Sequence, residues 1–437
     1  MHSHPVRLVL LVLAAFGLFG SASGQRLEDG EVTFETKIRK SQALRNQLRK
    51  GELVANPKDK EHVEAVEDTA RGIVYPLYWK TTNKPEISKV NLVVEDFAAR
   101  LVELNRYRPN ANPFIQMTCK EVIDCSVEII KRPESKPIAG INAARLMSLI
   151  VQRRAPGGVV IAEKLWVEET RPRLADGNAE QLAEACLSLL AEPKLTDGHR
   201  YYFYRCLSSL LSLPQSPPLL KPETVDKILQ KATEQIEKKA VFPKATPRQE
   251  VEGYKMLRQQ AVVVLAAGRK PVAGDKLRPI LLLARVAAAD TDLVPAPRLP
   301  ERVEAAIGLA RMGSASAKLP DVQMDYAASA LVAAVIEFGK QANPNISAPA
   351  TTRLQPWKVE AARLNEALDE LKLSVKTPYV QDAIRECQGK VLGDLEKGLV
   401  CQVGQLADWA TTNPPLAKSL FKSDPASTFK GVAPAPE

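Results

Sequence analysis

Apolar side chains recur three and four positions apart along most of the chain. Such stripes occupy residues 63–77, 90–104, 225–236 and 357–371. This spacing places the apolar side chains on one face of an α-helix, so each stripe predicts a helix that packs this face against a neighbour. No segment alternates apolar and polar residues between hairpin turns, as a half-buried strand would. The pattern therefore predicts an all-α fold.

Prolines separate the apolar stripes. The chain contains 32 prolines, and most of them fall between stripes rather than inside them. They divide the chain into predicted helices of about 12 to 20 residues, a usual length in globular proteins. Pro222 precedes the stripe at 225–236 and fits the first turn of a helix, where its missing N–H costs nothing. Pro279 lies inside the stretch 277–288, so that helix either begins near Pro279 or is kinked there.

Residues 274–341 show the clearest pairing of helices. Two helices are predicted at 277–284 and 302–313, with a long connection between them. The second helix contains paired alanines and ends at Gly313, and residues 325–339 are alanine-rich in the same way. This small-residue pattern, which lets helices pack closely, resembles that of HEAT repeats.

The resemblance to HEAT-like helical-repeat proteins implies an irregular α-solenoid of paired antiparallel helices. A solenoid of this kind is built from repeats of about 40 residues. The N-terminal half shows no clean period of that length, and the connection within 274–341 is longer than HEAT repeats usually have. A non-repeating multi-helix bundle is therefore the alternative interpretation.

The first 24 residues have the three regions of an export signal in the expected order. Arg7 precedes an apolar run at 8–20, and small residues follow at 21–24. The run suits a signal peptide and is too short to span a bilayer comfortably. We therefore expect cleavage after Gly24 and an exported chain, periplasmic or extracellular. No later stretch approaches the roughly 20 uninterrupted apolar residues of a membrane span, so none is expected after signal cleavage.

Proline-rich connections divide the remaining chain into predicted regions. An N-terminal helical region is expected over 25–213 and a HEAT-like helical region over 219–342. C-terminal helices are expected over 357–422. Residues 423–437 contain few large apolar side chains, so this segment is predicted to be a disordered tail.

Composition and charge narrow the function only a little. Apolar residues make up 45% of the chain and charged residues 25%, which is typical of a folded globular protein. The formal net charge is +9, and loss of Arg7 with the signal leaves +8. A cationic surface outside the cytoplasm attracts anionic polymers and lipid head groups. The lysines and arginines are nevertheless spread among 51 acidic residues, which favours solvated helix faces over one dedicated patch, and no nucleic-acid partner is expected.

The six cysteines pose a redox question. An even number of cysteines in an exported protein is compatible with disulfides. Cys186 and Cys206 fall on predicted neighbouring antiparallel helices, so they are the candidate disulfide. The alternative is that the cysteines are small buried hydrophobic residues without a bond, because they lie on the apolar stripes.

The sequence contains no recognisable catalytic or metal-binding motif. His62 and His199 belong to no His-x-x-x-His pair, and the chain has no Cys-x-x-Cys knuckle, no Gly-x-Ser-x-Gly elbow and no glycine-rich phosphate loop. His199 precedes the aromatic and cationic stretch 200–205. This stretch is either a surface that stacks on sugars or bases, or a helix whose aromatic side chains fill the interior. No catalytic residue, metal ligand or cofactor is predicted.

These observations favour an exported, non-enzymatic helical-repeat protein that acts as a protein-interaction scaffold in the cell envelope. One alternative is a basic protein that binds anionic envelope polymers such as wall polymer or lipopolysaccharide. The other is an enzyme with an unrecognised helical active site.

Overall fold

The computed structural model describes residues 41–82, 90–97, 109–151, 176–212, 219–274, 277–347 and 356–430. These residues form sixteen α-helices and no β-strand, with only isolated bridges outside the helices. The prediction of an all-α fold is confirmed. The predicted export signal at 1–24 lies outside the described residues.

The contacts divide the chain into two compact units, Met1–Asn178 and Ala179–Glu437. The boundary predicted at the prolines of 214–218 falls within the second unit. Residues 213–218 are outside the described part of the chain, but the helices before and after them pack together, which explains why no division occurs there.

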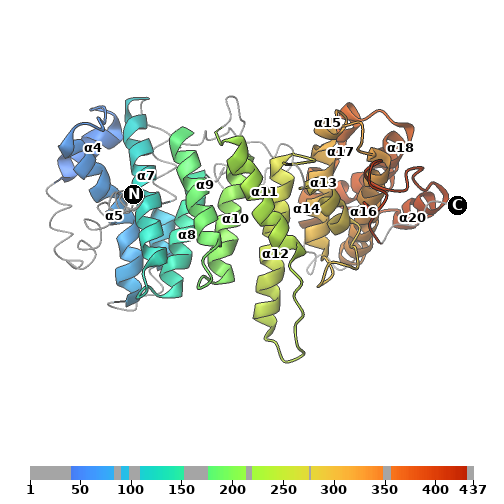
Figure 1. Ribbon diagram of the computed structural model, residues 1–437, viewed down its shortest axis with the longest axis horizontal. Helices are drawn as coiled ribbons and strands as arrows, with labels where there is room; N and C mark the ends of the chain where they lie inside the picture. The colour runs from blue at the N-terminus through green and yellow to red at the C-terminus, as the bar shows by residue number, and fades with distance from the viewer. Residues whose placement is uncertain are drawn as a thin grey trace, which may run out of the picture. The chain divides into compact units, whose positions relative to one another are not determined.

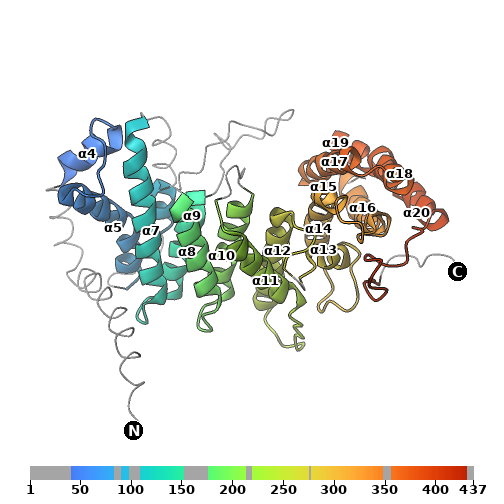
Figure 2. The same ribbon diagram turned by 45° about the horizontal axis from the view of Figure 1, so that its top comes forward.

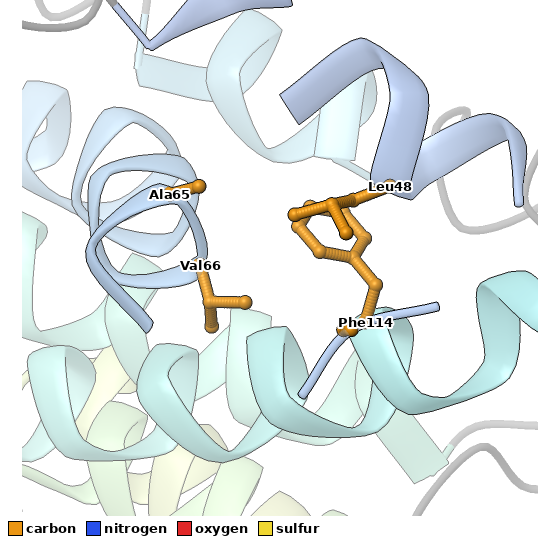
Figure 3. Packing of buried hydrophobic residues seen from close by; sticks show 5 residues of the cluster. Leu48, Ala65, Val66 and Phe114 are labelled. Atoms are coloured by element: carbon orange, nitrogen blue, oxygen red, sulfur yellow. The ribbon is translucent and has the colours of Figure 1, made fainter. Parts of the chain in front are cut away.

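The first unit is built on helix α7, which packs against both α5 and α8. Leu48, Val66 and Phe114, from α4, α5 and α7, meet in a buried apolar cluster (Figure 3). The stripe predicted at 63–77 supplies the buried face of α5. The helices of this unit are α4 (Gln42–Lys50), α5 (Lys60–Thr82), η1 (Pro109–Ala111), α7 (Asn112–Lys131) and α8 (Pro137–Val151), and residues 90–97 are also helical.

The second unit begins with a group of helices centred on α12, which packs against α10, α11 and α14 (Figure 1). The apolar stripe of α11 is buried against this group: Val225, Ile228, Leu229 and Ala232 are all buried. The helices of the group are α9 (Asp176–Leu190, almost all of it in this unit), α10 (Asp197–Leu211), α11 (Pro222–Glu237) and α12 (Arg248–Gly268).

Helix α14 is central to the remainder of the second unit, because it packs against α12, α13, α16 and α17. The C-terminal helices then follow one another around α16 and α17 (Figure 2). The bounds are α13 (Pro279–Ala287), α14 (Leu299–Arg311), α15 (Gly313–Ser316), α16 (Met324–Ser347), α17 (Pro356–Ser374), α18 (Pro378–Cys387), the π-helical turn η3 (Gln388–Leu392), α19 (Gly393–Lys397) and α20 (Val403–Thr412).

The segment predicted to resemble HEAT repeats contains α13, α14 and α16, and these three helices pack on one another. Pro279 is the first residue of α13, so the helix begins there and is not kinked. No repeat or solenoid is identified in the described residues, and the finer prediction of an irregular solenoid stays a prediction beside the bundle alternative.

The prediction of a disordered tail from Ser423 is wrong for residues 423–430. The carboxylate of Asp321 accepts hydrogen bonds from the Ser423 N–H at 2.7 Å and the Ser423 hydroxyl at 2.6 Å. Phe429 is buried, and its ring centroid lies 4.5 Å from that of Tyr326 in α16. The composition of this segment led to a wrong prediction, because one buried phenylalanine and a few side-chain hydrogen bonds are enough to fix the segment on the helices. Residues 431–437 lie outside the described residues.

A buried ion pair joins α12 to α14. Arg258 is 1% exposed and Glu301 is not exposed at all. The guanidinium donates from Nε to Glu301 Oε1 at 2.6 Å and from Nη2 to Oε2 at 3.2 Å. Its remaining donors reach the carbonyl oxygens of Pro295 and Ala296, at 2.5 and 3.3 Å. Glu301 also accepts from the Arg298 N–H at 2.6 Å, which caps the start of α14.

Candidate functional site

The described residues hold no group of three or more histidine, cysteine, aspartate or glutamate side chains that could bind a metal ion. Within the same residues, no helix has the length and apolar character required to cross a membrane. His62 and His199 lie in different units, and each is engaged locally. His62 Nδ1 accepts a hydrogen bond from the Asn56 N–H at 3.1 Å.

His199 is a buried residue in the first turn of α10. Its Nδ1 lies 2.8 Å from the hydroxyl of Thr196, just before the helix. Burial, and then the nearby charge of Arg200, lower the pKa of His199 to about 4. The imidazole is therefore neutral at pH 7. Phe203 and Tyr204 are buried further along the helix, and Tyr204 donates its hydroxyl to the Lys231 carbonyl at 3.0 Å. These two aromatic side chains fill the interior rather than forming a stacking surface.

Acidification will destabilise the second unit through His199. The folded pKa of about 4 lies below the ordinary value of 6.5, so the unfolded chain binds the proton more readily as pH falls from 6.5 to 4. The stabilisation is complete above pH 6.5, and about 2 kcal/mol of it will be lost between pH 7.5 and pH 5. Urea unfolding at the two pH values, compared between the wild type and His199→Gln, measures this loss. A variant with the same pH dependence as the wild type would contradict the assignment.

Cys186 and Cys206, the candidate disulfide, are brought together by α9 and α10. Neither cysteine forms a disulfide, both side chains are fully buried, and a hydrogen bond joins them. Burial raises the pKa of Cys206 well above its usual range, and the hydrogen bond with Cys186 adds to the shift. The Cys206 thiol is therefore not a ready nucleophile while the unit is folded. The disulfide stays a prediction, which mass spectrometry before and after thiol alkylation tests.

The other four cysteines are also buried, and none of them forms a disulfide. Burial raises the pKa of Cys125 to about 12 and raises the pKa of Cys387 as well. These side chains therefore act as small hydrophobic residues. Cys401 differs from them, because its backbone and side chain take part in a polar contact that shapes an exposed turn.

The turn between α19 and α20, residues 398–402, is held from α16 by one side chain. The amide of Asn343 donates to the Cys401 carbonyl at 3.0 Å. Its oxygen accepts from the Cys401 N–H at 2.9 Å and from the thiol at 3.2 Å. The Gln402 N–H donates to the Lys390 carbonyl at 2.8 Å. The contacts between Asn343 and Cys401 thus fix the C-terminal end of the turn on α16.

Gly398 sets the beginning of the same turn. It ends α19 with φ at 74°, the left-handed conformation that closes helices and favours glycine. A side chain at this position would also meet Lys358, because an added Cβ would lie 2.8 Å from its Cε atom. The Leu399 N–H then donates to the Asp394 carbonyl at 2.9 Å. The backbone of the turn is therefore fixed at both ends.

The fixed turn presents apolar side chains to solvent. Leu399 is 53% exposed and Val400 is 54% exposed. Lys358 and Lys397 are exposed beside them, and neither forms an ion pair with a described residue. Leu399 and Val400 are therefore adjacent exposed apolar side chains on ordered backbone, with cations at their edge. We call residues 398–402 with Lys358 the α19–α20 surface.

Sequence analysis did not identify the α19–α20 surface. Gly398 after Lys397 is a recognisable helix end, but the following Leu-Val-Cys run has the composition of a buried segment. Exposure of Leu399 and Val400 results from the contact between Asn343 and Cys401, 58 residues apart in the chain.

Comparison of the chain with protein-family models, curated proteins and solved structures finds no match. The resemblance of residues 274–341 to HEAT repeats therefore gains no support from related proteins.

Proposed function

We propose that this chain is an exported, non-enzymatic helical protein that binds a protein partner through the α19–α20 surface. The observation that carries the proposal is the exposure of Leu399 and Val400 on a turn that Asn343 holds in place. Apolar side chains on ordered backbone bind at a low entropic cost, and their burial supplies the favourable hydrophobic term. The two lysines at the edge favour a partner whose apolar pocket is bordered by carboxylates.

The scaffold role rests on the helical architecture as well. Packed helices joined by short connections offer many exposed faces, and an irregular solenoid would extend them into one long surface. The export signal predicted at 1–24 gives the partner a location, the periplasm or the cell exterior. The proposed partner is thus a protein of the cell envelope.

The serine double variant Leu399→Ser/Val400→Ser tests the α19–α20 surface. Both side chains are exposed, so the fold tolerates the change, while the partner loses two apolar contacts. The wild-type chain is expected to recover a specific protein from envelope extracts. Titration of that purified protein should show affinity about tenfold or more weaker for the double variant, since each lost contact is worth on the order of 1 kcal/mol.

Leu416→Ser is the matched control, because Leu416 is almost fully exposed outside the α19–α20 surface. This variant should bind the partner as tightly as the wild type. Repeated recovery of no specific protein would overturn the proposal, and so would equal affinity of the double variant and the wild type.

A further inference from the structure

The connection from α11 to α12 carries an unusual concentration of positive charge. Residues 238–249 include four cations and no carboxylate. All four side chains are exposed, and none forms an ion pair with a described residue. The four cations are Lys238, Lys239, Lys244 and Arg248. Sequence analysis predicted cations dispersed on solvated helix faces, whereas these four lie close together in the chain on one exposed connection.

This connection projects from the second unit. In Figure 1 the first turns of α12 and the segment before them extend beyond the ends of α11 and α14. The Thr246 N–H donates to the Pro243 carbonyl at 2.9 Å, which forms a turn, and α12 begins directly after Pro247. We call residues 238–249 the basic tip.

Contacts at the base hold the basic tip in shape. The Ala240 N–H donates to the Val294 carbonyl at 3.1 Å, and the Tyr254 hydroxyl donates to the Lys238 carbonyl. The ring of Phe242 packs edge-on against Tyr254, with 5.5 Å between the ring centroids. Ala240 and Phe242 therefore face the body of the unit. Val241, between them, points outward and is 82% exposed.

Carboxylates flank the basic tip: Glu237 lies 3.8 Å from Arg285, and Glu250 is exposed in the first turn of α12. Glu252 is paired with Lys255 at 3.2 Å and with Arg298 at 2.9 Å. Asp292 is paired with Lys430 at 2.9 Å. Glu237, Glu252 and Asp292 thus have partners outside the basic tip. None of the four cations is held in a contact ion pair with a described residue, so their side chains are accessible to an external anion.

We infer that the basic tip docks on an anionic phospholipid surface, with Val241 entering the boundary between head groups and acyl chains. Lysine and arginine side chains near such a surface each contribute to binding, and all four cations of the tip are exposed. A bilayer also accepts an exposed apolar side chain among its head groups, which a soluble polyanion does not. Charge and the exposed valine together select the membrane surface over a wall polymer or nucleic acid.

Vesicle sedimentation with the full exported chain tests the inference. The probes are vesicles of phosphatidylglycerol with phosphatidylcholine, and vesicles of phosphatidylcholine alone. We expect binding only to the anionic vesicles, and a steep loss of binding as salt is raised, because exposed charges are screened. Binding of equal strength to both vesicles would overturn the inference.

Two variants separate charge from apolar insertion. The first replaces all four cations of the basic tip with glutamine, and its partition onto anionic vesicles should fall about a hundredfold or more, since each cation is worth about fivefold. The second is Val241→Ser, which should bind about threefold or more weakly at constant salt. Both leave the backbone contacts of Ala240 and Lys238 intact.

A control variant removes the same number of exposed cations from other parts of the second unit. The four lysines replaced with glutamine are Lys318, Lys340, Lys418 and Lys422, which are exposed and form no ion pair with a described residue. The fold loss of binding to anionic vesicles should be less than a tenth of the fold loss that the tip variant shows. Equal losses would show that net charge alone drives binding and would overturn the basic tip as the site. An unchanged affinity of Val241→Ser would overturn insertion into a bilayer in favour of a soluble polyanion.

Discussion

Replacing Arg258 with methionine is expected to destabilise the protein by about 3 to 5 kcal/mol, as measured by urea unfolding at pH 7. The substitution leaves the carboxylate of Glu301 fully buried without its closest cation, and only the more distant Arg298 guanidinium, at 3.7 Å, stays beside it. It also removes the donors that Arg258 directs to the carbonyl oxygens of Pro295 and Ala296. Two carbonyl groups would then lose these donors, and the buried carboxylate would lose its two shortest contacts with a cation, each of which is costly.

The double variant Arg258→Met/Glu301→Gln separates the charge from the packing. Glutamine is neutral, keeps the size of glutamate, and still accepts from the Arg298 N–H at the start of α14. We expect the double variant to regain at least half of the stability lost by Arg258→Met, because the unpaired charge is gone. A double variant less stable than the single one would contradict this account.

The surface pair of Arg385 and Asp382 provides a control for the same type of interaction. Its atoms lie 2.9 Å apart, yet both side chains are largely exposed. Arg385→Met should change the free energy of unfolding by less than about 1 kcal/mol, since solvent already screens this pair. An Arg258→Met variant as mild as this control would show that the α12–α14 pair has no special role.

The helices themselves could be predicted from local pattern, because burial of one face leaves a period that the sequence displays. The stripe at 225–236 became the buried face of α11, and Pro279 became the first residue of α13. The partners of charged side chains leave no such pattern. Arg258 and Glu301 are 43 residues apart and are indistinguishable in sequence from residues on a solvated helix face.

The same limit explains the two surfaces that sequence analysis missed. Leu399 and Val400 are apolar residues that a distant asparagine holds in solvent, and Val241 is turned outward by the contacts of Ala240 and Phe242. Exposure of this kind depends on tertiary contacts rather than on the residue itself. The proximity of Cys186 and Cys206 could be predicted from sequence, because consecutive helices of similar length tend to be antiparallel neighbours.

Gly308 marks the second position where a small change should have a large effect. The alanine variant Gly308→Ala is expected to lose about 3 kcal/mol of unfolding free energy. A Cβ at this position in α14 would lie 2.7 Å from the Cβ atom of Ala266 and 2.9 Å from its Cα atom in α12. It would also lie 2.9 Å from Leu283 Cδ1 in α13. Leucine can rotate away, but the α12 backbone at Ala266 can move only with the whole helix.

Gly253→Ala is the matched control, because Gly253 lies within α12 and an added Cβ would meet no atom within 4 Å. Alanine stabilises an open helical position by about 1 kcal/mol relative to glycine, so this variant should unfold at a higher urea concentration than the wild type. The same substitution is thus expected to have opposite signs at two helical positions. Equal stability of the two variants would show that α12 and α14 can separate freely at Gly308, and that their close approach does not hold this part of the unit together.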